Sequence, residues 1–305
     1  KRTSFFMYTG LLIILVPLMV GYLLPWHQPA LLQRVNRLLS LLIYAILFFM
    51  GTSLAFLDNL GTNLLIVFKT ALIAAGAILS CSLLALWLLD RRWPWRQQHR
   101  QQDLPSRWHM VLESLKLCVA VLAGFLLGLT QWAPLRHAST LSEIALIVLL
   151  FLVGVQLRGS GMTLRQITLN RRGMTVALVS LCGSLGGGVL AAWLLGVSLS
   201  TGLALASGFG WYSLSGILMT EAYGPVIGSA AFFNDLLREL AAVLLIPVLV
   251  NRYRSMALGL SGATSMDFTL PILQRAGGME IVPAAIVHGF IMNLLAPILI
   301  ALFSA

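Results

Sequence analysis

Two acidic residues lie inside stretches of the chain that are otherwise apolar. Glu239 falls in FFNDLLRELAAVLLIPVLV, and Asp267 falls in GLSGATSMDFTLPIL. An ionised acid at the centre of a bilayer costs about 2.5–3.5 kcal/mol even on the lenient insertion scale. Carboxylates found at such depth typically bind a cation, carry a proton, or do both. We therefore interpret Glu239 and Asp267 as the core of a site that binds a cationic substrate and protons.

Further polar residues in the same part of the chain could complete this site. Asp235 and Glu239 are four positions apart and so share one helix face, with Arg238 beside them. Arg238 could pair with Asp235, or the three residues could form a cluster that neutralises itself. Other donors and acceptors are neutral: Asn234, Ser213, Ser215, Thr264, Ser265 and Asn293.

The ring-bearing residues of this region have competing interpretations. His288 lies in the last apolar run, where a hydrogen-bonded core histidine competes with a proton relay. Trp211, followed by Tyr212, could cover an alkyl chain or an ammonium group by cation–π contact. Anchoring at the membrane interface explains this aromatic pair equally well.

These residue types together fit an amino acid with a cationic side chain. Its ammonium groups would meet Glu239 and Asp267, and its carboxylate would meet the N-terminus of a half-helix or Arg238. The acids could also exchange protons as the substrate leaves, which would couple export to inward proton flow. No cofactor or metal is expected, because Cys81, Cys118 and Cys182 each stand alone and are interpreted as small buried apolar residues.

The elements that must position these residues are membrane helices. The chain is 59% hydrophobic and 10% charged, against about 25% charged residues in ordinary soluble domains. The whole chain, 1–305, is expected to form one all-α transmembrane domain without a cleavable signal peptide. Candidate spans are 7–24, 38–57, 64–89, 115–131, 143–157, 174–195, 236–250 and 280–303.

The net charge of +10 is distributed in a way that argues against nucleic-acid binding. The connections at 90–114 and 158–173 carry five and four arginines, whereas those at 58–63 and 196–202 carry none. Basic connections mark the cytoplasmic side. We therefore predict a multi-pass bacterial inner-membrane protein with both termini in the periplasm.

A weak internal repeat is present. Residues 48–54, FFMGTSL, resemble residues 151–157, FLVGVQL, at an offset of 103. The offset contains three spans, so the units 7–89 and 115–195 would be inverted copies, as in many secondary transporters. Chance similarity between helices rich in leucine and glycine is the alternative.

Two stretches within 203–278 differ from ordinary spans. Residues 203–235 contain five glycines and a proline, and residues 257–278 contain a Gly-Ala-Thr-Ser sequence and Pro271. Loop charges require the chain to enter and leave each stretch on one face, outer for the first and inner for the second. Two broken or re-entrant hairpins that meet near the middle are predicted, a device that places transporter binding sites at the midplane. Packing alone is the alternative.

The chain also resembles a known family at these residues. ASGFGWYSLSGIL, GPVIGSAAFFNDL, GLSGATSMDFTLP and VPAAIVHGF, together with LFFMGTSLAFLDNL and NRRGM in the N-terminal half, are similar to the LysO-type lysine exporters of enterobacteria. The resemblance implies export of L-lysine and of the toxic analogue thialysine across the inner membrane. It also implies eight spans and two essential intramembrane acids, which match Glu239 and Asp267. Only residues 1–6 lie outside the likeness.

Other functional classes fit the residues less well. An intramembrane aspartyl protease needs Tyr-Asp and Gly-x-Gly-Asp, whereas Asp235 follows Asn and Asp267 follows Met. A Ser/His protease needs Gly-x-Ser-Gly, and the chain has SLSG. The alternative transporter is a cation-coupled carrier of organic anions with a bile-acid-like fold, which would require more basic pocket residues than Arg238. A homo-oligomer is compatible with the sequence.

Overall fold

The computed structural model describes residues 16–24, 28–56, 60–95, 107–132, 135, 138–159 and 170–305. All regular secondary structure in this part of the chain is helical, which confirms the all-α prediction. Four described helices are long and apolar enough to cross a membrane: Ala30–Thr52, Gly61–Arg92, Arg171–Leu195 and Val282–Ser304. Shorter apolar helical segments lie at Cys118–Gly128 and Ile144–Gln156. The chain therefore has the make-up of a multi-pass membrane protein.

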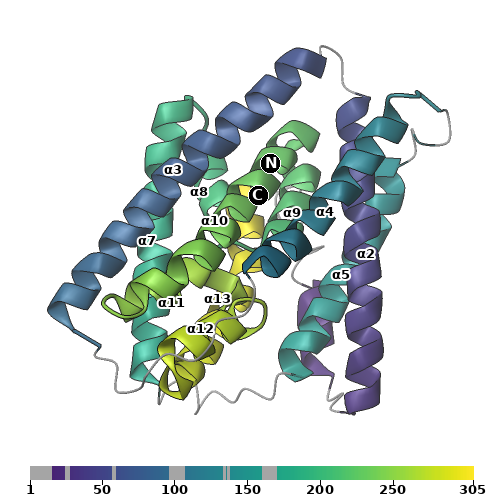
Figure 1. Ribbon diagram of the computed structural model, residues 1–305. Helices are drawn as coiled ribbons and strands as arrows, with labels where there is room; N and C mark the ends of the chain where they lie inside the picture. Colours follow the sequence, from purple (N-terminus) through teal and green to yellow (C-terminus); the bar gives the residue numbers. More distant parts are fainter. Residues whose placement is uncertain are drawn as a thin grey trace, which may run out of the picture.

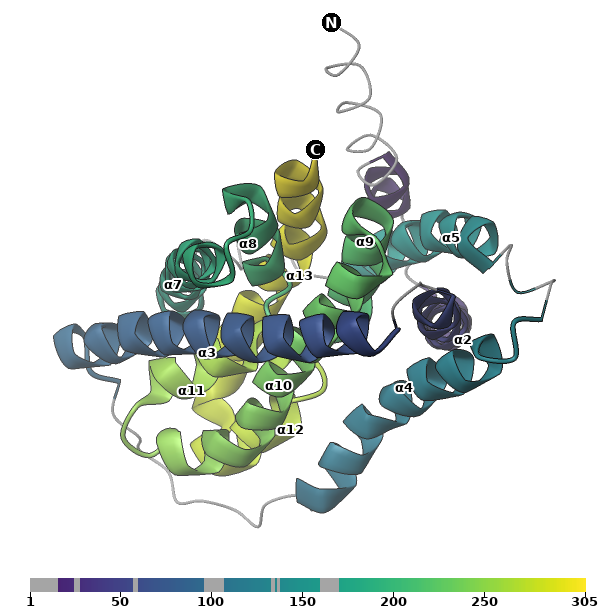
Figure 2. The same cartoon turned by 90° about the horizontal axis from the view of Figure 1, so that it is seen from above.

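One side of the molecule is a panel of closely packed helices. It contains α2 (Pro29–Ala55), α4 (Arg107–Gly128), α5 (Ala138–Gly159) and a helix at 16–23, seen at the right of Figures 1 and 2. A side chain on Gly51 or Gly124 would collide with a carbonyl oxygen of the facing helix, and the same holds for Gly21 and Gly154. These glycines let helix backbones touch, as small residues do in membrane bundles.

On the opposite side α3 (Leu60–Arg92) packs along α7 (Arg171–Leu195). The Asn170 side chain caps α7 by accepting a hydrogen bond from the Gly173 N–H. Gly196, with φ 67°, ends α7, and the Ser198 hydroxyl caps α8 (Leu199–Ala206). Left-handed glycine and capping serine are the residues that such helix ends favour, so the chain reverses sharply from α7 into α8.

Two interrupted segments lie between these sides. In the first, α8 is separated from α9 (Tyr212–Tyr223) by residues 207–211, and Gly224 joins α9 to α10 (Pro225–Leu249). In the second, α11 (Arg254–Ser261) is followed by the 3₁₀ helix η2 (Gly262–Met266) and then by α12 (Leu270–Gly277). The short η3 (Met279–Ile281) leads into α13 (Val282–Ser304).

The irregular part of the first predicted broken segment, residues 203–235, is shorter in the structure than predicted. Most of 203–235 is regular helix, interrupted at 207–211 and at Gly224. Two of its glycines instead serve packing: a Cβ on Gly216 would lie 2.9 Å from the Phe232 Cβ, and one on Gly228 would collide with the Thr220 hydroxyl. The span predicted at 236–250 likewise begins earlier, at Pro225. The three cysteines predicted to be buried are more accessible than expected: Cys81 and Cys118 are half-buried, and Cys182 is exposed.

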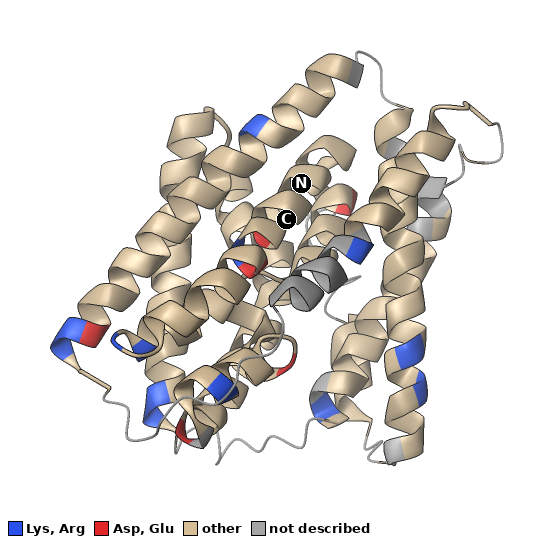
Figure 3. Cartoon of the chain, in the orientation of Figure 1, with Lys and Arg blue, Asp and Glu red and all other residues tan. Residues whose placement is uncertain are grey.

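Basic residues gather at one end of the molecule, the lower end in Figure 3. Exposed members of this group come from the ends of six helices or their connections: Arg34, Arg37, Arg91, Arg92, Arg158, Arg171, Arg252 and Arg275. The distribution separates the two ends of the bundle by charge, as the loop pattern of the sequence predicts.

Candidate functional site: the crossing of two interrupted segments

The two interruptions touch each other through their backbones. The Ala263 N–H donates a hydrogen bond to the Phe209 carbonyl at 3.0 Å. Phe209 has φ 52° and Gly262 has φ 58°, so both breaks use left-handed residues. A side chain on Gly262 would collide with the Phe209 carbonyl oxygen. We refer to the contact of residues 207–211 with η2 as the crossing.

Asparagine amides from the two long helices satisfy carbonyls beside the crossing. Asn234 of α10 donates its Nδ2 to Leu205 O in the last turn of α8, at 3.2 Å. Asn293 of α13 donates its Nδ2 to Ala263 O at 2.6 Å and to Gly289 O at 2.8 Å. Irregular backbone at membrane depth needs such partners. Both residues predicted for the site thus hold the breaks in place.

Asp235 fastens the first break to α10. Its Oδ1 accepts a hydrogen bond from the Gly210 N–H at 2.8 Å, while its buried Oδ2 makes no hydrogen bond. A side chain on Gly208 would overlap Oδ2 and come within 2.8 Å of the Ser215 Cβ, so these residues line one spot. Ser213 is also buried in the first turn of α9. The predicted Asp235 and Ser215 therefore come together at the first break, with Ser213 buried in the adjoining turn of α9.

Arg238 is directed toward the second interrupted segment. Its Nη2 donates to Gly259 O at 2.8 Å and its Nε donates to Leu260 O at 3.3 Å, both in the last turn of α11. Nη1 and Nη2 also donate to Ser184 at 3.1 Å and to Ser180 at 3.3 Å on α7. Four of the five guanidinium N–H groups are used this way. The hydrogen bonds of Arg238 thus go to α7 and α11 rather than to Asp235, whose carboxylate still attracts the guanidinium.

The other end of α11 is held by an acid that the sequence did not single out. Asp90 of α3 accepts hydrogen bonds from the Ser255 N–H at 3.1 Å and from the Met256 N–H at 2.9 Å. Its position between Leu89 and Arg91 suggests only a helix end near a basic loop. The two carboxylate oxygens supply the cap that the first turn of α11 requires.

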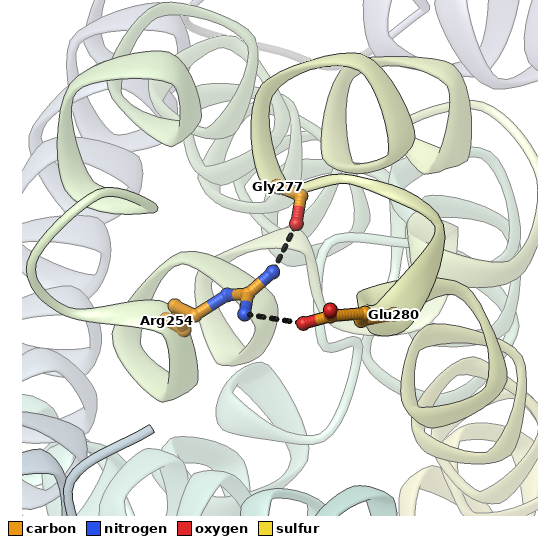
Figure 4. A network of polar contacts seen from close by, with 3 residues as sticks. All are labelled: Arg254, Gly277 and Glu280. Carbon is orange, nitrogen blue, oxygen red and sulfur yellow. Dashed lines mark hydrogen bonds and ion pairs between the residues drawn. The ribbon is translucent and has the colours of Figure 1, made fainter. Parts of the chain in front are cut away.

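Arg254 closes the base of the second interrupted segment (Figure 4). One guanidinium nitrogen donates to Gly277 O at the end of α12, and another lies 3.6 Å from a Glu280 oxygen. The guanidinium also lies 5.1 Å from the ring centre of Trp95. The side chain is fully buried, although Glu280 is 33% exposed. Arg254 therefore joins the start of α11 to the end of α12.

Arg254→Gln is expected to lower stability by about 1–3 kcal/mol, because hydrogen bonds from a charged donor are lost while Glu280 can still be solvated. The melting temperature of purified protein in detergent would measure it. Arg252→Gln, at an exposed neighbour, is the matched control. Equal melting temperatures for the two variants would contradict a stabilising role for the Arg254 contacts with Gly277 and Glu280.

The two acids of the predicted site lie in different surroundings. Glu239 is 3% exposed and shares the buried face of α10 with Asp235 and Arg238. Asp267 follows η2, is exposed, and accepts a hydrogen bond from the Phe268 N–H at 2.6 Å. Nearby, Thr264 donates its hydroxyl to Ser261 O at 2.8 Å. A shared site for Glu239 and Asp267 stays a prediction.

His288 contacts the second break. Its Nδ1 lies 3.0 Å from the Ser265 Oγ, and Ser265 donates to Ala285 O at 2.9 Å. Nε2 is buried and makes no hydrogen bond. Trp211 is half-buried and precedes α9 without capping it through its side chain. The structure therefore gathers most of the predicted polar residues around the crossing.

Comparison with known proteins now places the chain. A family model described as "Lysine exporter LysO" matches residues 118–304. "Lysine exporter LysO" of Escherichia coli K12 is 63% identical over 299 residues, 98% of this chain and 100% of that protein. The chain belongs to the LysO family. A "Putative lysine exporter" of Haemophilus influenzae Rd is 45% identical over 192 residues, 62% of this chain and 97% of its own length. These matches confirm the resemblance to the LysO family. LysO proteins are transporters rather than enzymes, so the protease interpretations are excluded.

Proposed function

We propose that the chain exports L-lysine, and the analogue thialysine, from the cytoplasm across the bacterial inner membrane, with inward proton movement through Glu239 and Asp267. The observation that carries this proposal is the burial of Glu239, 3% exposed, on α10 one turn after Asp235, which binds the first break. An acid at such depth fits binding of an ammonium group and exchange of a proton. The 63% identity to an E. coli lysine exporter supports the choice of lysine.

The remaining predicted residues receive roles consistent with their contacts. The lysine carboxylate would meet the first turn of α9 or α12, which start at the breaks and whose N-cap residues make no side-chain cap. Helix N-termini attract anions. Arg238 fits this role less well, because four of its N–H groups already bind α7 and α11. Thr264, Ser265, Ser213, Ser215 and Trp211 supply neutral surroundings.

The proposed orientation puts the basic end of the bundle in the cytoplasm and both termini in the periplasm. The first interrupted segment then enters from the periplasm and the second from the cytoplasm. An inverted repeat is supported by the packing of the helix panel. Gly51 and Gly154 are 103 residues apart, as are Gly21 and Gly124, and the close contacts join Gly51 to α4 and Gly154 to the helix at 16–23. Exchanged partners of this kind suit two inverted copies.

Thermal shift of the purified protein tests the substrate class. We expect lysine to raise the melting temperature more than arginine or ornithine, and a dicarboxylate to have no effect, because binding to the folded state stabilises it by mass action. Uptake of labelled lysine into inside-out proteoliposomes with an imposed proton gradient tests transport and coupling. Stabilisation by the dicarboxylate instead of lysine would favour the organic-anion carrier.

A further inference from the structure

The half-helix α11 is held at both ends by a charge from another helix. An eight-residue helix leaves most of its backbone groups without intrahelical partners, four N–H at its start and four C=O at its end. Asp90 accepts hydrogen bonds from two of the N–H groups. Arg238 donates to two of the C=O groups. Side chains from α3 and α10 thus bind two of these groups at each end of α11, and the Ser180 hydroxyl of α7 also donates to Gly259 O.

The signs of the two charges match the helix dipole. An acid at the N-terminus and a cation at the C-terminus are both favourable. Both side chains are buried, Asp90 at 6% exposed and Arg238 at 3%, so screening by solvent and salt is weak. Arg238 also binds Ser180 and Ser184 on α7, and α7 packs along α3. The α3–α7 pair therefore serves as the frame against which α11 is fixed.

We infer that Asp90 and Arg238 are positioning residues, which hold α11 at its two ends and so fix where η2 meets the first interrupted segment. The break follows α11 directly, since Gly262 is the next residue after Ser261. A displaced α11 would move the Ala263 N–H away from Phe209 O and would move Asp267 with it. This role deepens the proposed transport function and rests on that function only where transport is measured.

Hydrogen–deuterium exchange of the full-length protein in lipid nanodiscs tests the inference without substrate. In Asp90→Asn we expect amide exchange at residues 254–261 to become at least about tenfold faster, because a charged acceptor is lost. In Arg238→Lys the same rise is expected at residues 259–269, since an ammonium group cannot span both carbonyls and both serines. Residues 29–55 serve as the internal reference. Unchanged exchange at α11 in either variant would overturn the inference.

Transport kinetics separate positioning from direct contact with substrate. We expect both variants to lower Vmax for lysine while KM changes by less than about threefold. If Arg238 instead bound the substrate carboxylate, Arg238→Lys would raise KM for lysine but leave inhibition by 1,5-diaminopentane, which lacks a carboxylate, unchanged. That pattern would overturn the inference. Arg252→Lys and Glu221→Gln, at exposed positions, are the matched controls.

A milder variant covers the case in which Arg238→Lys does not accumulate. Replacing Ser184 by alanine removes one guanidinium contact with α7. Ser180 is kept, because its hydroxyl also donates to Gly259 O of α11 at 3.4 Å. A smaller rise in exchange at residues 259–269 is expected, and no rise contradicts the inference. If the variants show the expected exchange but the parent protein does not move lysine, the proposed function is refuted and the positioning role stands.

Discussion

Asp267→Asn and Glu239→Gln are each expected to reduce lysine transport driven by a proton gradient by about 100-fold, which corresponds to about 3 kcal/mol of lost interaction with the ammonium group or the proton. The amides keep the size of the acids but can neither carry a proton nor neutralise an ammonium group. Because Glu239 is buried and Asp267 is exposed after η2, the two acids are tested in separate variants. Labelled lysine uptake into proteoliposomes measures the effect.

Glu221→Gln is the matched control, since Glu221 is an exposed acid near the end of α9. Transport by this variant should equal that of the parent. If Glu239→Gln and Asp267→Asn transport lysine as fast as the parent protein, the proposed role of the acids is refuted. Loss of gradient-driven uptake with lysine–lysine exchange preserved would assign the affected acid to protons rather than to substrate.

Gly262→Ala should have the largest effect on stability, a loss of about 3 kcal/mol or more. Gly262 has φ 58° and ψ −135°, a conformation essentially restricted to glycine. The added methyl group would also collide with Phe209 O, the acceptor of the backbone hydrogen bond at the crossing. Strain and steric overlap therefore act together. Thermal melting of the detergent-solubilised protein, followed by size-exclusion chromatography, provides the measurement.

Gly186→Ala supplies the comparison. Gly186 lies within α7, and a methyl group there would meet no atom within 4 Å. Alanine is favoured over glycine in helices by about 1 kcal/mol, so this variant should melt at the same temperature or slightly higher. A melting temperature for Gly262→Ala as high as that for Gly186→Ala would show that the crossing is not held by backbone contact.

Hydropathy predicted the bounds of three long apolar helices well and those of α10, which carries several polar residues, poorly. The spans 64–89, 174–195 and 280–303 agree with α3, α7 and α13 within a few residues. The span at 236–250 misses the first eleven residues of α10, 225–235. Asn234 and Asp235 lower the local hydropathy there, and Pro225 and the glycines read as a break. Tertiary packing overrides such propensities, because the small residues allow α9 and α10 to approach closely.

The polar face of α10 could be predicted, but its partners could not. The four-residue spacing of Asp235 and Glu239 places both on one helix face, and both are buried there together with Arg238. Nothing local indicates that the guanidinium turns toward Ser180, 58 residues earlier in the chain. The carboxylate that caps Ser255 is likewise 165 residues away. Contacts at such separations depend on helix packing, which one sequence does not specify.

The amide of Asn293 bears on how the chain assembles during synthesis. Asn293 lies on α13, which leaves the ribosome after both interrupted segments, and its Nδ2 binds Ala263 O at the crossing. Before α13 is inserted, that carbonyl lacks this donor, and an unsatisfied carbonyl in hydrocarbon costs several kcal/mol. The second interrupted segment therefore gains this hydrogen bond only after the downstream helix α13 has been translated and inserted, so the crossing is completed late in synthesis.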